Sequence, residues 1–152
     1  MKFTKAMRWV AAASVAAVLT VAAGTSPAKA SVTRAFRGHT SGTIEFTSQT
    51  TATVTGSGQA TRMGNFDRLE HVTLGAGGTV SGDITFTDDN NPGDQIFVEF
   101  SGSFVSANDV EGTYDITGGT GRFAGADGTA TFHANTPDLV NMTGTWEGTI
   151  EY

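Results

Sequence analysis

The stretch Asn141-Met-Thr-Gly-Thr-Trp-Glu-Gly-Thr-Ile-Glu-Tyr152 carries the pattern that decides the fold. Its even-numbered positions are apolar or glycine, whereas its odd-numbered positions carry threonine, glutamate and one asparagine. Side chains of a β-strand alternate between two faces, so this period of two predicts a strand with one buried face and one face in water. β-branched threonine on the wet face favours the same conformation.

The same alternation recurs along the chain, and no helical periodicity of any length follows Ala30. Short links rich in Gly, Asn and Asp separate the runs, which favours antiparallel neighbours because parallel strands need long crossovers. We therefore expect an all-β fold, an eight-stranded antiparallel up-and-down β-barrel whose closure removes the sheet edges. A two-sheet sandwich is the structural alternative. The predicted strands cover residues 38–47, 50–61, 65–74, 78–88, 94–106, 109–118, 125–135 and 142–151.

Glycine interrupts the inward faces of these strands repeatedly. Gly weakens a strand, so its repeated use there needs a reason. Sharp coiling of the barrel wall is the geometric explanation, and space for a ligand is the functional one. The geometric explanation is favoured, and both stay open. The inward glycines are Gly42, Gly56, Gly58, Gly82, Gly102, Gly112, Gly128, Gly144 and Gly148.

The first thirty residues have the pattern of a secretory signal peptide. Three basic residues precede Trp9, an apolar run extends to Ala23, and Ala28-Lys29-Ala30 is typical of a cleavage site. The apolar run is shorter than the ~20 residues that span a bilayer. We therefore expect a signal peptide at residues 1–30, a single barrel domain at 31–152, and an extracellular location.

Charge and composition exclude several classes of function. The chain has 152 residues and no cysteine, which rules out disulfides, thiolate metal sites and cysteine nucleophiles. The expected mature chain keeps five basic residues, all arginine, against fifteen acidic ones. This balance disfavours nucleic acid as a partner, because phosphate contacts need basic patches. It also opposes adhesion to anionic membranes, so no membrane partner is expected after cleavage.

The segment Gly118-Gly-Thr-Gly-Arg-Phe-Ala-Gly-Ala-Asp-Gly128 resembles the signature Gly-Gly-Thr-Gly-[Arg/Lys]-Phe-x-x-Ala-x-Gly of dirigent proteins. It is also similar to the wider barrel superfamily that includes allene oxide cyclases. Residues 58–65 and 91–97 resemble segments of secreted bacterial relatives. The resemblance implies an eight-stranded antiparallel barrel that is commonly trimeric, so a homo-oligomer is an expectation that rests on the resemblance alone.

The signature itself has a structural interpretation. Glycines permit positive φ and close backbone approach in a wide turn. Phe123 can fold under the loop and plug the barrel end, while Arg122 can bond loop carbonyls or a carboxylate such as Asp115 or Asp127. We therefore interpret this segment as a turn that closes the fold.

Candidate chemistry lies on the third and sixth predicted strands. If even-numbered residues face inward, Arg62, Arg68, Glu70 and Tyr114 lie in or near the lumen. Buried charges are costly unless they are paired, so an Arg–Glu group inside a barrel points to a site. A bulge near Gly64 would instead shift the register by one residue and turn these side chains to solvent.

The candidate catalytic residues are therefore Glu70, Arg68 and Tyr114. The candidate ligand contacts are Arg62 and the inward aromatic residues Phe86, Phe100 and Trp146. No cofactor is expected. No metal is expected either, because the histidines His39, His71 and His133 lie at outward positions on strands that are far apart in the strand order.

Three hypotheses of function remain open at this point. The first is a barrel that binds an apolar small molecule and steers its cyclisation or coupling, as the resemblance implies. The second is a secreted carrier or surface interaction module without catalysis and with a filled barrel. The third is a true cyclase or isomerase with an acid/base pair. Whether Arg62, Arg68 and Glu70 point into a cavity discriminates among them.

Overall fold

The computed structural model describes residues 30–152. The predicted signal peptide lies outside the described residues except for Ala30. No helix in residues 30–152 is long and apolar enough to cross a membrane. Eight strands and two short 3-10 turns make up the fold: β1 (Thr33–Phe46), β2 (Thr51–Ala60), β3 (Gly64–Leu74), η1 (Ala76–Gly78), β4 (Thr79–Asp88), β5 (Gln95–Phe104), β6 (Asp109–Gly119), η2 (Gly121–Phe123), β7 (Asp127–Asn135) and β8 (Asn141–Glu151).

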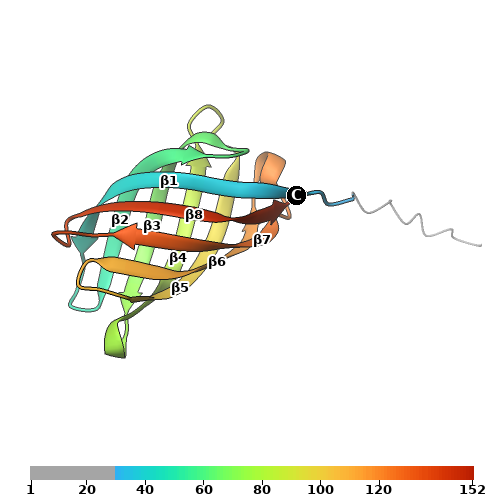
Figure 1. Ribbon diagram of the computed structural model, residues 1–152. Coiled ribbons are helices and arrows are strands. Elements are labelled where there is room, and N and C mark those ends of the chain that lie inside the picture. The colour runs from blue at the N-terminus through green and yellow to red at the C-terminus, as the bar shows by residue number, and fades with distance from the viewer. Residues whose placement is uncertain (1–29) are drawn as a thin grey trace, which may run out of the picture.

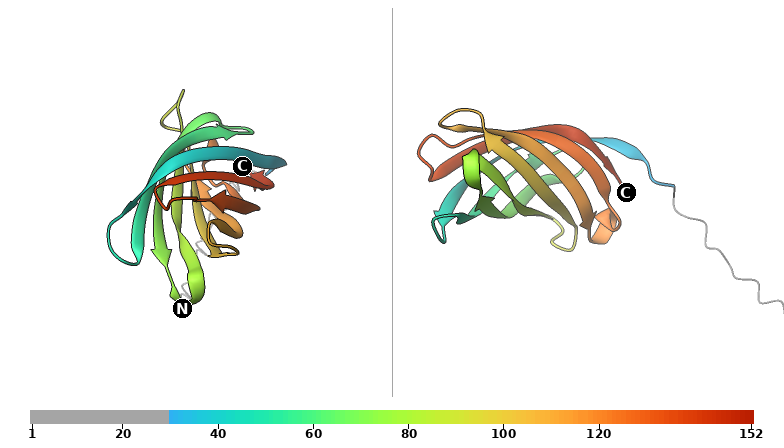
Figure 2. Two further views of the ribbon diagram at one scale, coloured as in Figure 1. Left: turned by 60° about the vertical axis from the view of Figure 1, so that its left-hand side comes forward. Right: turned by 90° about the horizontal axis from the view of Figure 1, so that it is seen from below.

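The strands form one closed barrel in chain order, and every neighbouring pair is antiparallel. Closure is made by β1 and β8, which pair from Thr33–Glu151 to Thr43–Asn141. Figures 1 and 2 show the tilted strands as a single wall, with β1 beside β8. The predicted up-and-down barrel is confirmed, and the sandwich alternative is wrong.

The first strand is longer than the alternation predicts. β1 begins at Thr33 instead of residue 38. Phe36 is fully buried in this added part, and the segment pairs with the end of β8. The sequence signal was weak there because Arg34 and Arg37 flank the single inward aromatic residue.

Even-numbered side chains face the interior on all eight strands, as the alternation predicts. The interior is filled mainly by aromatic and branched aliphatic side chains. A register shift between Phe97 and Val98 in the β5–β6 pair changes the parity only at the end of β6, where the buried Ile96 faces Gly119, whereas the buried Val98 faces Ile116. The most completely buried side chains are Phe36, Phe66, Phe86, Phe123, Ile84, Ile96, Ile150 and Val98.

Inward glycines let neighbouring strands approach closely. Gly42 faces Gly56 across β1 and β2, and a Cβ on Gly56 would collide with the Ser41 carbonyl oxygen. Gly102 and Gly112 form the equivalent pair across β5 and β6. Because the obstruction is backbone rather than open space, these glycines serve the coiling of the wall. The geometric explanation is therefore the correct one at these positions.

One end of the barrel, here called the closed end, consists of the links 61–63, 89–94 and 120–126. Thr120 binds the 89–94 link and the start of β5, because its hydroxyl donates to Gly93 O at 2.7 Å and its backbone N–H donates to Gln95 O at 2.9 Å. Phe123 is fully buried and packs edge-on against Tyr152 at 4.9 Å between ring centroids. The signature segment is thus a plug, as its interpretation predicted.

Arg122 fastens this plug to the opposite link. Its guanidinium forms ion pairs with Asp88 and Asp94, whose side chains are 5% and 9% exposed. The Arg122 backbone N–H also donates to Asp94 Oδ1 at 3.0 Å. The expected carboxylate partners, Asp115 and Asp127, are wrong, since both lie exposed on strands. The ion pairs of Asp88 and Asp94 with Arg122 therefore hold the 120–126 link in place.

Candidate functional site

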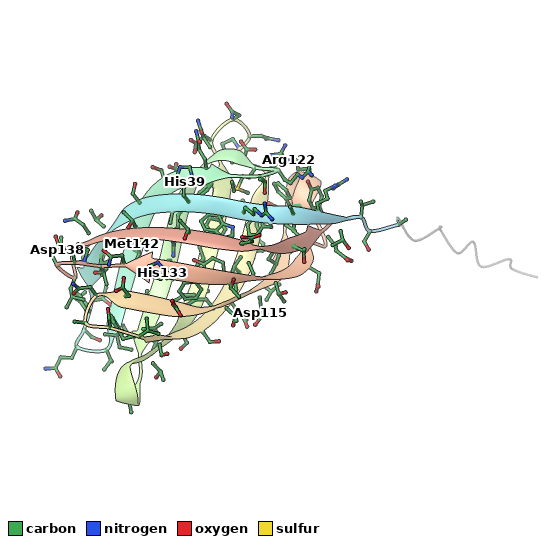
Figure 3. The ribbon with its side chains drawn as sticks, viewed as in Figure 1. His39, Asp115, Arg122, His133, Asp138 and Met142 are labelled. Atoms are coloured by element: carbon green, nitrogen blue, oxygen red, sulfur yellow. The ribbon has the colours of Figure 1, made fainter. Side chains whose placement is uncertain are left out.

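The other end of the barrel, here called the open end, carries the links 47–50, 75–78, 105–108 and 136–140. A cavity of about 90 Å³ lies inside it. Figure 3 places Asp138 and Met142 towards this end and Arg122 at the opposite one. Most of the lining is apolar: Ile44, Phe46, Ala52, Val54, Val72, Leu74, Val80, Phe100, Phe104, Val110, Phe132, Ala134 and Met142, with Arg68, Glu70, Tyr114 and Thr136 as polar members.

The three predicted catalytic residues come together at this cavity. Arg68 and Glu70 stand two residues apart on β3, so they share its inward face, and Tyr114 reaches them from β6. The Arg68 guanidinium forms an ion pair with Glu70, and the two side chains are 3% and 8% exposed. The bulge that would have turned them outward is absent from β3, since Gly64 simply opens the strand opposite Ala60.

Burial governs the ionisation of these groups. It raises the pKa of the Glu70 carboxyl, although the Arg68 charge beside it acts in the opposite direction. Burial likewise raises the pKa of Tyr114 to about 12. Burial alone would lower the pKa of Arg68, but Tyr114 and Glu70 outweigh it and hold that pKa above its usual value. Arg68 is therefore a cation, and Tyr114 keeps its proton at neutral pH.

Two polar atoms at the cavity have no hydrogen-bond partner among the described residues: Arg68 Nε and Thr136 Oγ1. The guanidinium otherwise forms the Glu70 ion pair, a long contact of 4.0 Å from Nη1 to Met142 Sδ, and a cation–π contact with the Phe86 ring at 6.0 Å. Buried donors are normally paired with protein or water, so an unpaired one beside a cavity indicates room for an acceptor. Thr136 lies in a link outside the strand pattern, and no sequence signal marked it.

Between the cavity and the plug lies a filled aromatic layer of Phe36, Phe66, Phe86 and Trp146. Phe86 and Trp146 stack at 5.3 Å between ring centroids, and Phe66 meets Phe86 edge-on at 5.0 Å. Trp146 also contacts Phe36 at 5.7 Å. This layer closes the lumen halfway, so the cavity occupies only the open half of the barrel.

The predicted ligand contacts divide accordingly. Phe100 lines the cavity and meets Phe132 edge-on at 6.0 Å. Phe86 and Trp146 are inward but belong to the filled layer and not to the cavity wall. Arg62 is exposed in the link between β2 and β3, with a positive φ of 74°, so its expected place in the lumen is wrong. The reason is that the alternation ends with β2 at Ala60.

The three histidines lie outside the lumen. His39 and His133 are exposed on the outer wall, where Figure 3 labels them, and His71 pairs with Asp83 at 3.0 Å on the outer face of β3. Within residues 30–152, no group of three metal-ligating side chains converges.

Comparison with known proteins adds information about the fold. No family model and no curated protein sequence matches the chain. Among solved structures, the pterocarpan synthase dirigent protein GePTS1 superposes with a TM-score of 0.55 at 12% sequence identity. The match covers 88% of this chain and 98% of that chain. At this identity the similarity concerns architecture, and the chain therefore has the eight-stranded barrel fold of a dirigent protein.

Proposed function

We propose that the chain is exported and that its barrel binds a small, largely apolar molecule in the cavity at the open end. The observation that carries this proposal is a buried Arg68–Glu70–Tyr114 group in an otherwise apolar cavity. Binding sites for small molecules are mostly apolar and hold a few convergent polar groups. A charged pair in the lumen costs desolvation energy that two apolar side chains would avoid, which supports a role other than stability.

Steering of a reaction is a second candidate, favoured by the ionisation of the same group. Tyr114 keeps its proton and can donate a hydrogen bond to an oxygen that gains negative charge. Arg68 would stabilise the same charge, and Glu70, with its raised pKa, would exchange a proton with the ligand. The narrow walls would hold a flexible chain in one folded conformation, which is how shape favours one cyclisation or coupling product.

The test of binding uses a variant that fills the cavity. Ala52 lines the cavity from β2, so Ala52→Met should occupy it, whereas Thr55→Met places the same side chain on the outer face of that strand. Native mass spectrometry of the full chain, incubated with a mixture of small ketones, phenols and alkanes, should show one-to-one adducts for the wild type and for Thr55→Met. Ala52→Met should lose them.

A second cavity-filling variant distinguishes loss of binding from loss of folding. Ala134→Leu enters the same cavity from β7, and thermal unfolding shows which variants are folded. Adducts that survive in both folded filling variants, or that never form with the wild type, contradict binding in this cavity.

A further inference from the structure

The chemistry of the ligand can be read from which hydrogen-bonding atoms remain free at the cavity. Glu70 accepts from the Arg68 guanidinium, and Arg68 Nε–H is left without a partner. Tyr114 lines the same cavity as Arg68 and keeps its proton at neutral pH. Its phenolic O–H can therefore donate a hydrogen bond. Arg68 Nε–H and the Tyr114 hydroxyl are therefore donors at this cavity, and a ligand with an acceptor atom would satisfy them.

The charge at this place is already balanced. Arg68 and Glu70 neutralise each other in a space where both side chains are under 10% exposed. A carboxylate ligand would bring a second negative charge close to Glu70, and an ammonium ligand would do the same to Arg68. Uncompensated charge is expensive in such surroundings. A neutral oxygen, by contrast, satisfies the donors without adding charge.

Exposed apolar side chains stand at the open end of the barrel. Phe46, Val105, Leu139 and Val140 are 46%, 55%, 46% and 54% exposed, and all four lie at the open end. Its links contain no basic residue and one acidic residue, Asp138. Because the enclosed volume is only about 90 Å³, a ligand longer than its polar head would extend past Phe46, which lines the cavity, towards the open end.

We propose that the ligand is a neutral, elongated, apolar molecule that enters with a carbonyl or ether oxygen first. That oxygen accepts hydrogen bonds from Arg68 Nε–H and the Tyr114 hydroxyl, and the apolar remainder lies against Phe104, Phe46 and the rim. This inference rests on the proposed function, because it concerns the same cavity. It excludes fatty acids and alkylamines as preferred ligands of equal length.

Three molecules of matched length test the inference: heptanone with a terminal methyl ketone, heptanoate and heptylammonium. Isothermal titration calorimetry with the full chain at neutral pH should show the ketone binding at least about tenfold more tightly than either ion. Tyr114→Phe should weaken ketone binding about tenfold, since one hydrogen bond is worth up to about that factor. Tyr152→Phe, at the closed end, is the matched control and should leave it unchanged.

The outcomes separate the two levels of the proposal. If heptanoate or heptylammonium binds more tightly than the ketone, the inference about the ligand is overturned and the binding function stands. If the ketone is preferred but Tyr114→Phe has no effect while the filling variant Ala52→Met abolishes binding, the oxygen does not reach Tyr114 and the entry orientation is wrong. If none of the three binds, the inference about the ligand is overturned, and the adducts of the wild type in the native mass spectrometry experiment decide separately whether the proposed function stands.

Discussion

Replacing Arg68 by methionine should be among the most damaging single changes in the lumen. The substitution keeps most of the side-chain volume and removes the charge, so Glu70 is left as a carboxylate that is 8% exposed and has lost its partner. Of the other charged groups nearby, His71 lowers the pKa of Glu70 only weakly, and Asp83 raises it. Leaving one member of a buried pair uncompensated typically costs about 3–5 kcal/mol of the free energy of unfolding.

The double variant Arg68→Met with Glu70→Leu should behave in the opposite way. Apolar side chains of similar volume then fill the site, and neither charge has to be desolvated. Its stability should lie within about 1 kcal/mol of the wild type or exceed it. Equilibrium urea denaturation gives these values for the wild type, both single variants and the double variant, which together form a double-mutant cycle.

The pH dependence provides an internal check. The pKa of Glu70 is raised in the folded chain, so its contribution to stability is full below its ordinary value of 4.5 and is lost as the pH rises through the folded value. Removing Arg68 removes a cause that lowers this pKa. The deficit of Arg68→Met should therefore be largest at neutral pH and shrink on acidification. A double variant as unstable as Arg68→Met, or a deficit independent of pH, would refute this account of the pair.

Alkaline pH should weaken the fold through Tyr114, whose pKa of about 12 exceeds the ordinary 10.0. Its stabilising contribution is intact below pH 10 and is lost as the pH rises towards 12, by up to roughly 3 kcal/mol, and Tyr114→Phe should abolish this loss in urea titrations at alkaline pH. Arg122→Met should cost about 2–3 kcal/mol, less than the lumen variant because Arg122 is 45% exposed, and a melting temperature equal to that of the wild type would contradict its role in the plug. Gly56→Ala should cost about 1–3 kcal/mol because its Cβ meets the Ser41 carbonyl, whereas Gly144→Ala, with its nearest neighbour at 3.3 Å, should cost less. Equal losses at both glycines would count against the close-approach explanation.

The strand pattern was predictable from sequence because each strand buries the side chains of one face and exposes those of the other face to solvent. That simple rule places Arg68 and Glu70 inside together, since residues two apart share a face. Closure into one barrel followed from short links and an even alternation along all eight strands. The five extra residues of β1 were missed because only one inward aromatic residue, Phe36, marks them.

The division of the lumen was beyond sequence reasoning. Alternation says that Phe86, Phe100 and Trp146 all point inward, but not at what height along the barrel axis each one stands. Height depends on the stagger of the strands, which places Phe86 and Trp146 in one filled layer and Phe100 above it. The partners of Arg122 were missed for a similar reason, because Asp88 at the end of β4 and Asp94 in the link that follows are distant from it in sequence.

The two ends of the barrel are built from different parts of the chain, and this separation has a consequence for redesign and divergence. The plug, its arginine lock and the aromatic layer specify the architecture, whereas four hairpin links and the strand tips beside them shape the mouth. Substitutions in distant, non-contacting groups tend to act additively. Substitutions in the open-end hairpins could therefore change which ligand is preferred, while the rest of the barrel wall stays the same. Binding proteins with variable loops on a fixed scaffold follow the same principle.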